Sequence, residues 1–478
     1  MTNIQINRIL DSTLREGEQT PNVYFTPEEK ANIAKMLIET IGQKLYLELG
    51  IVYNDFYRQG VEYTLRYLDE LGLKANTLVH SRAIKEDIDI SFKSGSWGVV
   101  IYLPGSDTHL KYKFKNKSFD WVLKTINDTV TYAKEELGFN FVAYTLEDAT
   151  SISLDRILKA ADTAFSAGAD VVRLPDTKGQ AEPWSLYEMI QTVVDHTGGE
   201  IDLHLHNDLG LAIANSIAGL KAGATGVHTS IKGLGERVGI TDLVTFIEVL
   251  ENLYSIKTGV NFKKLYPLYQ YVSACTGMPI AKDHPVLGIN ARTHKAGVHQ
   301  QAVLNELETT GKVHTYETID FSKYSLQREF EFGAMQSKEL TKLYLKRMNV
   351  KTSENEIQTI TKSVRQMSMD IGRPLAPIEV NQIFEDALGK EIPVKTKDIV
   401  NVLVELNVNT NIDETVLIKK IRQIVTSNSA HCDILEVTGQ TDFFIYIKNA
   451  RNINKIISDI EHISGISDSR VNVVLGEY

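Results

Sequence analysis

The chain has 478 residues, of which 43% are hydrophobic, and its 51 basic and 61 acidic side chains give a formal net charge of −10. A chain of this length can bury a large core and is expected to form more than one domain. Its mildly acidic, evenly mixed charge argues against nucleic acid or a membrane as the main partner.

Short apolar runs alternate with longer amphipathic runs over the first half of the chain. Parallel strands joined by crossover helices produce this alternation, and eight such units predict an α/β protein with a closed (β/α)8 TIM barrel over residues 1–260. The alternative, an open doubly wound sheet, needs a Gly-rich turn after its first strand, which this sequence lacks. The predicted strands are 6–12, 45–49, 75–80, 98–103, 140–145, 170–175, 201–206 and 226–231.

The alternation stops near residue 260, and the rest of the chain reads as two further parts. Residues 261–392 are predicted to form a mixed helical linker region. Residues 393–478 are predicted to form a ferredoxin-like βαββαβ domain. Its expected elements are a strand at 399–408, a helix at 414–425, strands at 432–439 and 442–449, a helix at 452–464 and a strand at 470–478.

The sequence also favours a cytoplasmic protein. Its start has no long apolar run of the signal-peptide type, and no stretch approaches the roughly 20 apolar residues of a transmembrane helix. Cys275 and Cys432 lie far apart and form no CxxC pair, so we expect neither a disulfide framework nor a thiolate metal site.

The clearest chemical signal is the HLH sequence on the seventh predicted strand. Residues i and i+2 of a strand face the same side, so His204 and His206 would present two imidazoles to one divalent cation. The alternative is a pair of histidines that binds no metal. Functional groups of a β/α barrel lie at the C-terminal ends of its strands, which makes Glu16, just after the first strand, the candidate third ligand.

Two more charged residues at strand ends are candidates for catalysis. The guanidinium group of Arg15 could hold a carboxylate or a developing oxyanion, although an Arg-Glu pair is often only a solvent-exposed ion pair. Glu147, at the end of the fifth strand, is a candidate base, with a structural alternative as an acid at a helix N-terminus. The glycines of GLGERVG (233–239) would let the backbone approach a ligand.

Seven motifs lie in order along the chain: DSTLREGEQTP, HSRA, LEDAT, LPDTKG, HLHNDLGLAIANS, GLGERVGIT and THKAGVHQ. Together they resemble the acetyl-CoA-dependent 2-alkylmalate synthases, which are the homocitrate, isopropylmalate and citramalate synthases of the DRE-TIM metallolyase superfamily. The resemblance covers roughly residues 5–310. Within the family, the chain is most similar to the homocitrate synthases that have a C-terminal amino-acid-sensing domain. Glu16, Ile240 and the THKAGVH segment favour this branch, whereas HNDLGLA is also common in isopropylmalate synthases.

The resemblance implies a role for each matching residue. Glu16, His204 and His206 would bind the metal, and Arg15 would stabilise the substrate oxygen. Gln19, Arg82 and Thr177 would bind the oxo acid, with Arg82 a candidate for its distal carboxylate. Glu147 would assist proton removal from acetyl-CoA. His299, with His294, would come from the segment after the barrel, often of a neighbouring subunit, which implies a homodimer or a higher homo-oligomer.

The reaction implied is condensation of acetyl-CoA with 2-oxoglutarate and water to give homocitrate and CoA, the first step of lysine biosynthesis through 2-aminoadipate. Isopropylmalate or citramalate synthesis, from 2-oxoisovalerate or pyruvate, is the alternative. The cofactor would be a divalent cation (Mg, Mn, Zn or Co), and an amino acid could act as feedback effector at the C-terminal domain. A non-catalytic amino-acid sensor is a further alternative, against which the set Arg15, Glu16, Glu147, His204 and His206 argues.

Overall fold

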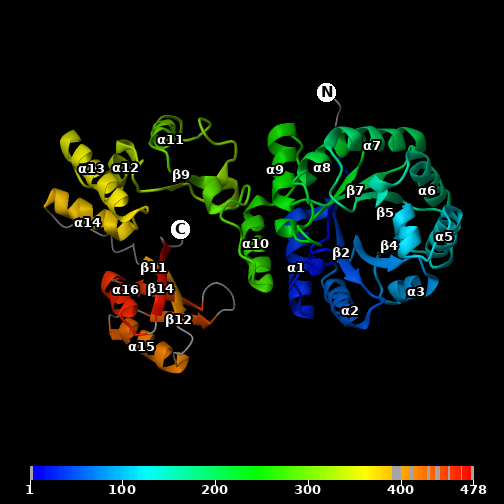
Figure 1. Ribbon diagram of the computed structural model, residues 1–478, viewed down its shortest axis with the longest axis horizontal. Helices are drawn as coiled ribbons and strands as arrows, with labels where there is room; N and C mark the ends of the chain where they lie inside the picture. Colours follow the sequence, from blue (N-terminus) through cyan, green and yellow to red (C-terminus); the bar gives the residue numbers. More distant parts are fainter. Residues whose placement is uncertain are drawn as a thin grey trace. The chain divides into compact units, whose positions relative to one another are not determined.

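The computed structural model describes residues 4–389, 400–408, 413–427, 431–436, 442–450, 453–464 and 466–474. The chain divides into two compact units (Figure 1). The first is Met1–Ala291 with Phe321–Leu326, and the second is Arg292–Asp320 with Gln327–Tyr478. No helix among the described residues is both long enough and apolar enough to span a bilayer.

Eight parallel strands form a closed barrel in the first unit, in which β8 pairs with β1. The predicted TIM barrel is therefore confirmed, and the open doubly wound sheet is excluded. Each strand overlaps its predicted run. The strands are β1 (Arg8–Asp11), β2 (Leu45–Ile51), β3 (Thr77–Arg82), β4 (Gly98–Pro104), β5 (Phe141–Glu147), β6 (Val171–Asp176), β7 (Ile201–Leu205) and β8 (Gly226–Thr229).

Helices surround the barrel and cover the outer face of its strands (Figure 1). The first helix begins at Pro27, where Thr26 and Glu29 form a capping box. The helices are α1 (Pro27–Ile41), α2 (Asp55–Glu70), α3 (Lys85–Lys93), α4 (Asp107–Tyr112), α5 (Phe119–Thr131), α6 (Leu154–Ser166), α7 (Pro183–Thr197), α8 (Ala212–Lys221), α9 (Leu243–Tyr254) and α10 (Phe262–Thr276).

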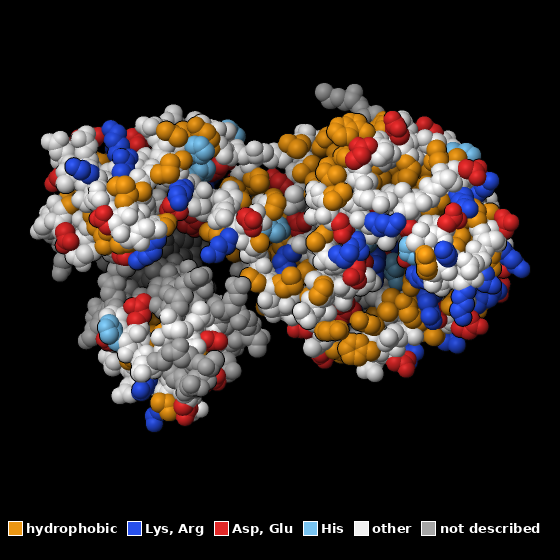
Figure 2. All heavy atoms as spheres, in the orientation of Figure 1, with side chains coloured by type: hydrophobic (Ala, Val, Ile, Leu, Met, Phe, Trp, Pro, Cys, Tyr) orange, Lys and Arg blue, Asp and Glu red, His pale blue; other side chains and the backbone are white. Residues whose placement is uncertain are grey.

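The barrel interior is charged as well as apolar. Glu48 on β2 forms an ion pair with Arg173 on β6, and both side chains are completely buried. Because β2 and β6 lie on opposite sides of the closed barrel, this ion pair crosses the interior. On the outside, acidic and basic side chains both occur across the face of the molecule seen in Figure 2.

The second unit begins with a helical part. Its core is apolar and includes Leu345, Ile360, Val364 and Phe384. The elements are β9 (Thr293–His294), α11 (Gly297–Thr310), β10 (Glu329–Phe330), α12 (Lys338–Arg347), α13 (Glu354–Ile371) and α14 (Pro377–Leu388), with β9 and β10 paired in parallel.

The last part of the chain contains an antiparallel four-stranded sheet in the order β12-β13-β11-β14. The final strand begins at Ile466, four residues before the predicted start, and the predicted end at 475–478 lies outside the described residues. The predicted domain boundary between 392 and 393 also lies outside them. The elements are β11 (Val400–Val408), α15 (Glu414–Ser427), β12 (His431–Glu436), β13 (Phe443–Ala450), α16 (Ile453–Glu461) and β14 (Ile466–Val474).

Candidate metal centre and active-site cavity

A cavity of about 350 Å³ lies at the C-terminal ends of the barrel strands. Polar and charged side chains from several different strands and from the loops that follow them line it, as is usual at this face of a TIM barrel. The cavity brings together most of the barrel residues for which the sequence predicts a role. These are Arg15, Glu16, Gln19, Glu147, Thr177, His204 and His206.

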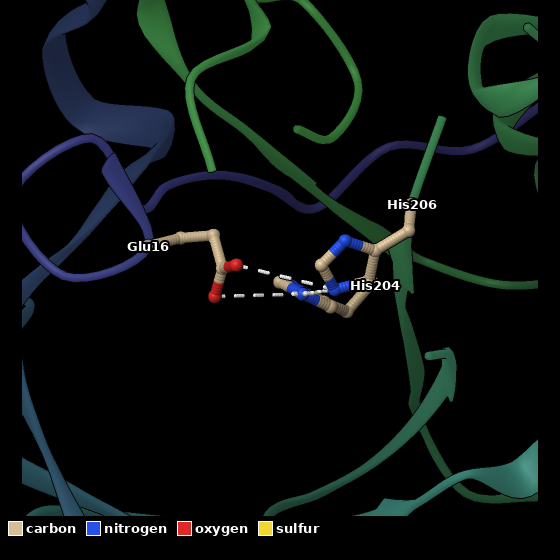
Figure 3. A group of neighbouring side chains, drawn as sticks. All are labelled: Glu16, His204 and His206. Carbon is tan, nitrogen blue, oxygen red and sulfur yellow. Dashed lines mark hydrogen bonds and ion pairs between the residues drawn. The ribbon is translucent and has the colours of Figure 1, made fainter. Parts of the chain in front are cut away.

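Glu16, His204 and His206 point toward one another inside this cavity (Figure 3). The two imidazole Nε2 atoms are 3.3 Å apart. The Glu16 carboxylate lies 3.9 Å from Nε2 of His204 and 4.0 Å from Nε2 of His206. All three side chains are buried, so the cluster is a possible metal site within the barrel.

The spacing and protonation of these groups suit a divalent cation. Ligand atoms about 2.1 Å from one ion lie about 3.0 Å apart at right angles and about 3.4 Å apart in a tetrahedron, so small shifts would bring this cluster onto one ion. Burial is the main cause that lowers the pKa of His204 and of His206. Both imidazoles are therefore neutral near pH 7, and neutral imidazole is the form that binds a metal.

The local backbone explains how Glu16 reaches the two histidines. After β1 the chain turns back on itself, with the backbone N–H of Glu16 donating to the carbonyl of Ser12 at 2.7 Å. The loop after β8 then fixes the carboxylate, since the N–H of Glu236 donates to Oε1 of Glu16 at 3.1 Å. A Cβ at Gly235 would lie 2.9 Å from Cγ of Glu16. The GLGERVG loop thus packs against the cluster, and Gly235 has no room for a side chain.

Arg15 lies beside the cluster and joins it to a second buried carboxylate. Its Nη1 contacts the Glu16 carboxylate, and its Nε donates to Oε2 of Glu48 at 3.2 Å. Burial acts to raise the pKa of Glu48, but His80, His228, Arg15 and Arg173 together lower it well below its usual range. Glu48 is therefore an anion that balances the buried guanidinium groups.

Glu147 lines the cavity, but its carboxylate is already engaged. Lys113 Nζ donates to both carboxylate oxygens, at 3.0 and 2.9 Å. His109 Nε2 lies 3.6 Å from Oε1 of the same group. On the neighbouring strand end, the Thr177 hydroxyl accepts the backbone N–H of Asp148 at 3.0 Å, so Thr177 presents its side chain in a fixed position.

Arg82 is the barrel residue of the predicted set that does not line the cavity. Its guanidinium group binds the Asp87 carboxylate at the start of α3. It also lies over the ring of Tyr53, 4.4 Å from the centroid. About half of its side chain is exposed to solvent, so in this conformation Arg82 contacts the rim of the barrel rather than the cavity.

His294 and His299 lie in the second unit, close to each other, with ring centroids 6.5 Å apart. His294 Nε2 is 2.8 Å from Oε1 of Glu317. The ring of His299 stacks on that of Tyr316 at a centroid distance of 3.9 Å. Each histidine is thus oriented by a neighbour within its own unit.

The sequence analysis missed several charged or polar residues of the site. Glu48, Arg173 and His228 lie inside otherwise apolar strands, and Lys113 is in a helix after β4. A single charged residue in a strand buried on both faces is a signal that could have found the first three, because such a residue needs a buried partner.

Comparison with known proteins agrees with the geometry of this site. Residues 7–272 match the HMGL-like family model. The chain belongs to the HMGL-like family. Residues 286–371 match a second model, described as homocitrate synthase post-HMGL domain-like.

Several curated relatives are named homocitrate synthase. One from Sulfurisphaera tokodaii is 31% identical over 98% of this chain and 98% of its own length. One from Sulfolobus acidocaldarius is 31% identical over 98% of this chain and 97% of its own length. A relative named 2-isopropylmalate synthase 2, from Caldanaerobacter subterraneus, is 32% identical over 80% of this chain and 96% of its own length. The family resemblance inferred from the motifs is thereby confirmed.

Proposed function

We propose that this protein is a homocitrate synthase that condenses acetyl-CoA with 2-oxoglutarate and water. The observation that carries the proposal is the cluster of Glu16, His204 and His206 inside the barrel cavity. It occurs in a chain that matches homocitrate synthases over 98% of its length. The match to the post-HMGL model at residues 286–371 supports the same branch of the family.

In this proposal, Glu16, His204 and His206 hold a divalent cation (Mg, Mn, Zn or Co). When bound, such a cation supplies Lewis acidity toward the carbonyl of the oxo acid. Arg15 stabilises the negative charge that develops on the substrate oxygen, since its guanidinium group is buried beside the cluster. Gln19 and Thr177 orient the oxo acid from the cavity wall.

The partner in the reaction is the methyl group of acetyl-CoA, a weak carbon acid that needs a positioned base. We assign this role to Glu147, which must first release Lys113 from its carboxylate oxygens. The resulting carbon nucleophile attacks the carbonyl carbon of the oxo acid, and the new alkoxide is held by Arg15. Hydrolysis of the thioester then releases CoA and makes the condensation effectively irreversible.

The remaining predicted residues keep their proposed roles. Arg82 would bind the distal carboxylate of the substrate after leaving Asp87, and His294 and His299 would complete the active site of a neighbouring subunit in a homodimer or higher oligomer. We propose three domains: a catalytic barrel at 1–260, a linker region at 261–392 and a ferredoxin-like regulatory domain at 393–478. The strand order β12-β13-β11-β14 supports the last assignment, and an amino acid is its proposed effector.

Isopropylmalate synthesis is the second candidate, and two observations favour it. Arg82, the residue expected to bind a second carboxylate, is bound to Asp87 instead of lining the cavity. The relative named 2-isopropylmalate synthase 2 is as similar in identity as those named homocitrate synthase. Citramalate synthesis from pyruvate belongs to the same alternative.

A thiol-release assay separates these functions. The protein is mixed with acetyl-CoA, a divalent cation and one of 2-oxoglutarate, 2-oxoisovalerate or pyruvate, and free CoA is measured. We expect release with 2-oxoglutarate. Release with 2-oxoisovalerate or pyruvate alone would overturn the choice of substrate, and no release with any oxo acid would overturn the synthase proposal.

A further inference from the structure

His228, on β8, contacts one of the two histidines of the metal cluster. Its Nδ1 atom lies 2.9 Å from Nδ1 of His204. The two rings meet edge to face, with centroids 4.9 Å apart. His228 is almost completely buried and takes no part in the mechanism proposed above.

The distance between the two Nδ1 atoms constrains the positions of their protons. Two neutral imidazoles at 2.9 Å must share one hydrogen, so one Nδ1 donates and the other accepts. Burial acts most strongly to lower the pKa of both rings, which keeps them neutral. Two arrangements are then possible, and only the one with the proton on His204 Nδ1 leaves its Nε2 lone pair free for a metal.

Glu48 favours one of these two arrangements, because it lies near Nε2 of His228, the ring nitrogen that does not face His204. Its Oε1 atom lies 3.7 Å from Nε2 of His228, beyond hydrogen-bond distance but close enough for electrostatic attraction in a buried site. A proton on His228 Nε2 faces this anion favourably, whereas a lone pair there would face it unfavourably. His228 Nδ1 is then the acceptor, and His204 Nδ1 must donate.

Other groups hold Glu48 in place for this role. Ser12 Oγ donates to its Oε2 at 2.6 Å, and His80 Nε2 is 2.8 Å from its Oε1. Arg15 and Arg173 also bind it. The carboxylate therefore cannot turn away from His228 without breaking several buried interactions.

We propose that His228 is a positioning residue that fixes His204 in the tautomer able to bind a metal through Nε2. The inference rests on the proposed metal site of Glu16, His204 and His206. It extends that site by two further residues: His228, which is hydrogen-bonded to His204, and Glu48, which attracts the far ring nitrogen of His228 electrostatically. Partners of this kind orient a metal-binding imidazole and raise its basicity.

His206 is held differently, which makes the inference specific to His204. The Nδ1 atom of His206 is buried and has no hydrogen-bond partner among the described residues. His206 can therefore carry its proton on Nε2, donating to His204 Nε2 at 3.3 Å, and move it to Nδ1 when that position is needed. The structure thus contains one histidine fixed in advance and one free to change tautomer.

Three substitutions of His228 test whether its Nδ1 atom acts as the acceptor for His204. The probe is Co²⁺, and its visible absorption measures binding. His228→Asn keeps an oxygen near the position of Nδ1, whereas His228→Gln keeps a polar atom near Nε2 only and His228→Leu keeps neither. We expect Co²⁺ affinity to fall about 10- to 100-fold in the Gln and Leu variants. The Asn variant should retain most of the affinity, and equal affinity in all three would overturn the proposal.

Two controls separate this outcome from failure of the metal site or of the fold. His196→Ala removes an exposed histidine of α7 that binds Asp162 and contacts neither Glu48 nor the metal-site residues in the described structure, so Co²⁺ affinity should change little. His204→Ala should lose Co²⁺ binding. If it does not, the metal site is wrong; if it does while the His228 variants bind normally, only the role of His228 is wrong.

The unaltered protein gives a test that needs no variant to fold. Nitrogen-15 NMR of histidine side chains in the metal-free protein distinguishes a protonated ring nitrogen from an unprotonated one. We expect the proton on Nδ1 of His204 and on Nε2 of His228. The reverse arrangement, with the proton on Nε2 of His204 and Nδ1 of His228, would overturn the proposal.

Discussion

The barrel and the C-terminal four-stranded sheet bury different kinds of side chain. Inside the barrel, Glu48, Arg173 and Asp202 are completely buried together with the histidines of the metal cluster. In the sheet and its two helices, every residue that the structure describes as buried is apolar. That core consists of Val404, Leu406, Leu417, Ile421, Val425, Phe443, Ile445, Ile447, Ile456, Ile460 and Ile463.

The difference indicates where each part can carry its function. Burying a charge costs free energy, and a buried ion pair is often less stabilising than apolar packing of the same volume. The barrel buries several charges around one cavity, and these charges lower the free energy of unfolding relative to an apolar interior. We interpret them as groups that serve the chemistry of that cavity. No such groups occur among the buried residues that the structure describes in the C-terminal core.

Removal of one metal ligand should have the largest effect. His204→Ala leaves two of the three ligands, so we expect affinity for Co²⁺ to fall at least about 1,000-fold and CoA release to stop. Titration followed by visible absorption and the thiol-release assay measure the two effects. His196→Ala is the matched control, because His196 is an exposed histidine of α7 bound to Asp162. Normal turnover in His204→Ala would refute the metal assignment.

Removal of the buried charge tests whether the barrel interior depends on its ion pairs. Glu48→Gln keeps the shape of the side chain but leaves Arg173 with only Asp202 as an anionic partner, 3.8 Å from its Nε. We expect the free energy of unfolding to fall by about 3–5 kcal/mol, measured by urea denaturation of the metal-free protein.

The pH dependence of that loss has a definite sign. The folded pKa of Glu48 lies well below the ordinary value of 4.5, so its stabilisation is complete above about pH 4.5 and disappears as the pH falls further. The difference between native and variant protein should therefore shrink in acid. Glu39→Gln, which removes an exposed partner of Lys264, should cost at most about 1 kcal/mol. Equal losses in the two variants would contradict the special role of Glu48.

A substitution in the apolar C-terminal core should lower stability without affecting metal binding or catalysis. Ile445→Ala creates a cavity in a fully buried position, and we expect that part of the chain to lose about 2–5 kcal/mol of unfolding free energy. Co²⁺ affinity and CoA release should stay unchanged. Hydrogen exchange locates the loss, and Val416→Ala, at an exposed position of α15, is the control. A matching fall in metal affinity would show that the two parts do not act separately.

The sequence predicted the barrel well because each strand is a short apolar run and the crossover helices between them have an amphipathic periodicity. It also predicted that Glu16, His204 and His206 meet, since His204 and His206 are two residues apart on one strand and Glu16 closely follows another. Both kinds of signal are local. Glu48 and Arg173 were missed because they are far apart in sequence and meet only when β2 and β6 face each other across the closed barrel.

Arg82 illustrates the opposite difficulty. Its place in a family motif suggested a group directed at the substrate, but an acid five residues later, Asp87, binds its guanidinium group at the rim. The choice between two partners depends on side-chain geometry, which a motif does not specify. The start of β14 at Ile466 was missed for another reason: ISDS, its first four residues, is more polar than the apolar run that follows.

Deletion of residues 393–478 should have only a small effect on catalysis, and it tests directly whether the barrel and the C-terminal part act separately. If the charges of the barrel carry the chemistry and the apolar C-terminal part carries regulation, kcat should change by no more than about twofold. Inhibition of the full chain by an amino acid such as lysine should be lost in the deletion variant. Both quantities come from the same thiol-release assay with and without lysine. Inhibition that survives the deletion would place the effector site outside residues 393–478. One such place is the barrel cavity, where the amino acid would compete with the oxo acid for the same cationic groups.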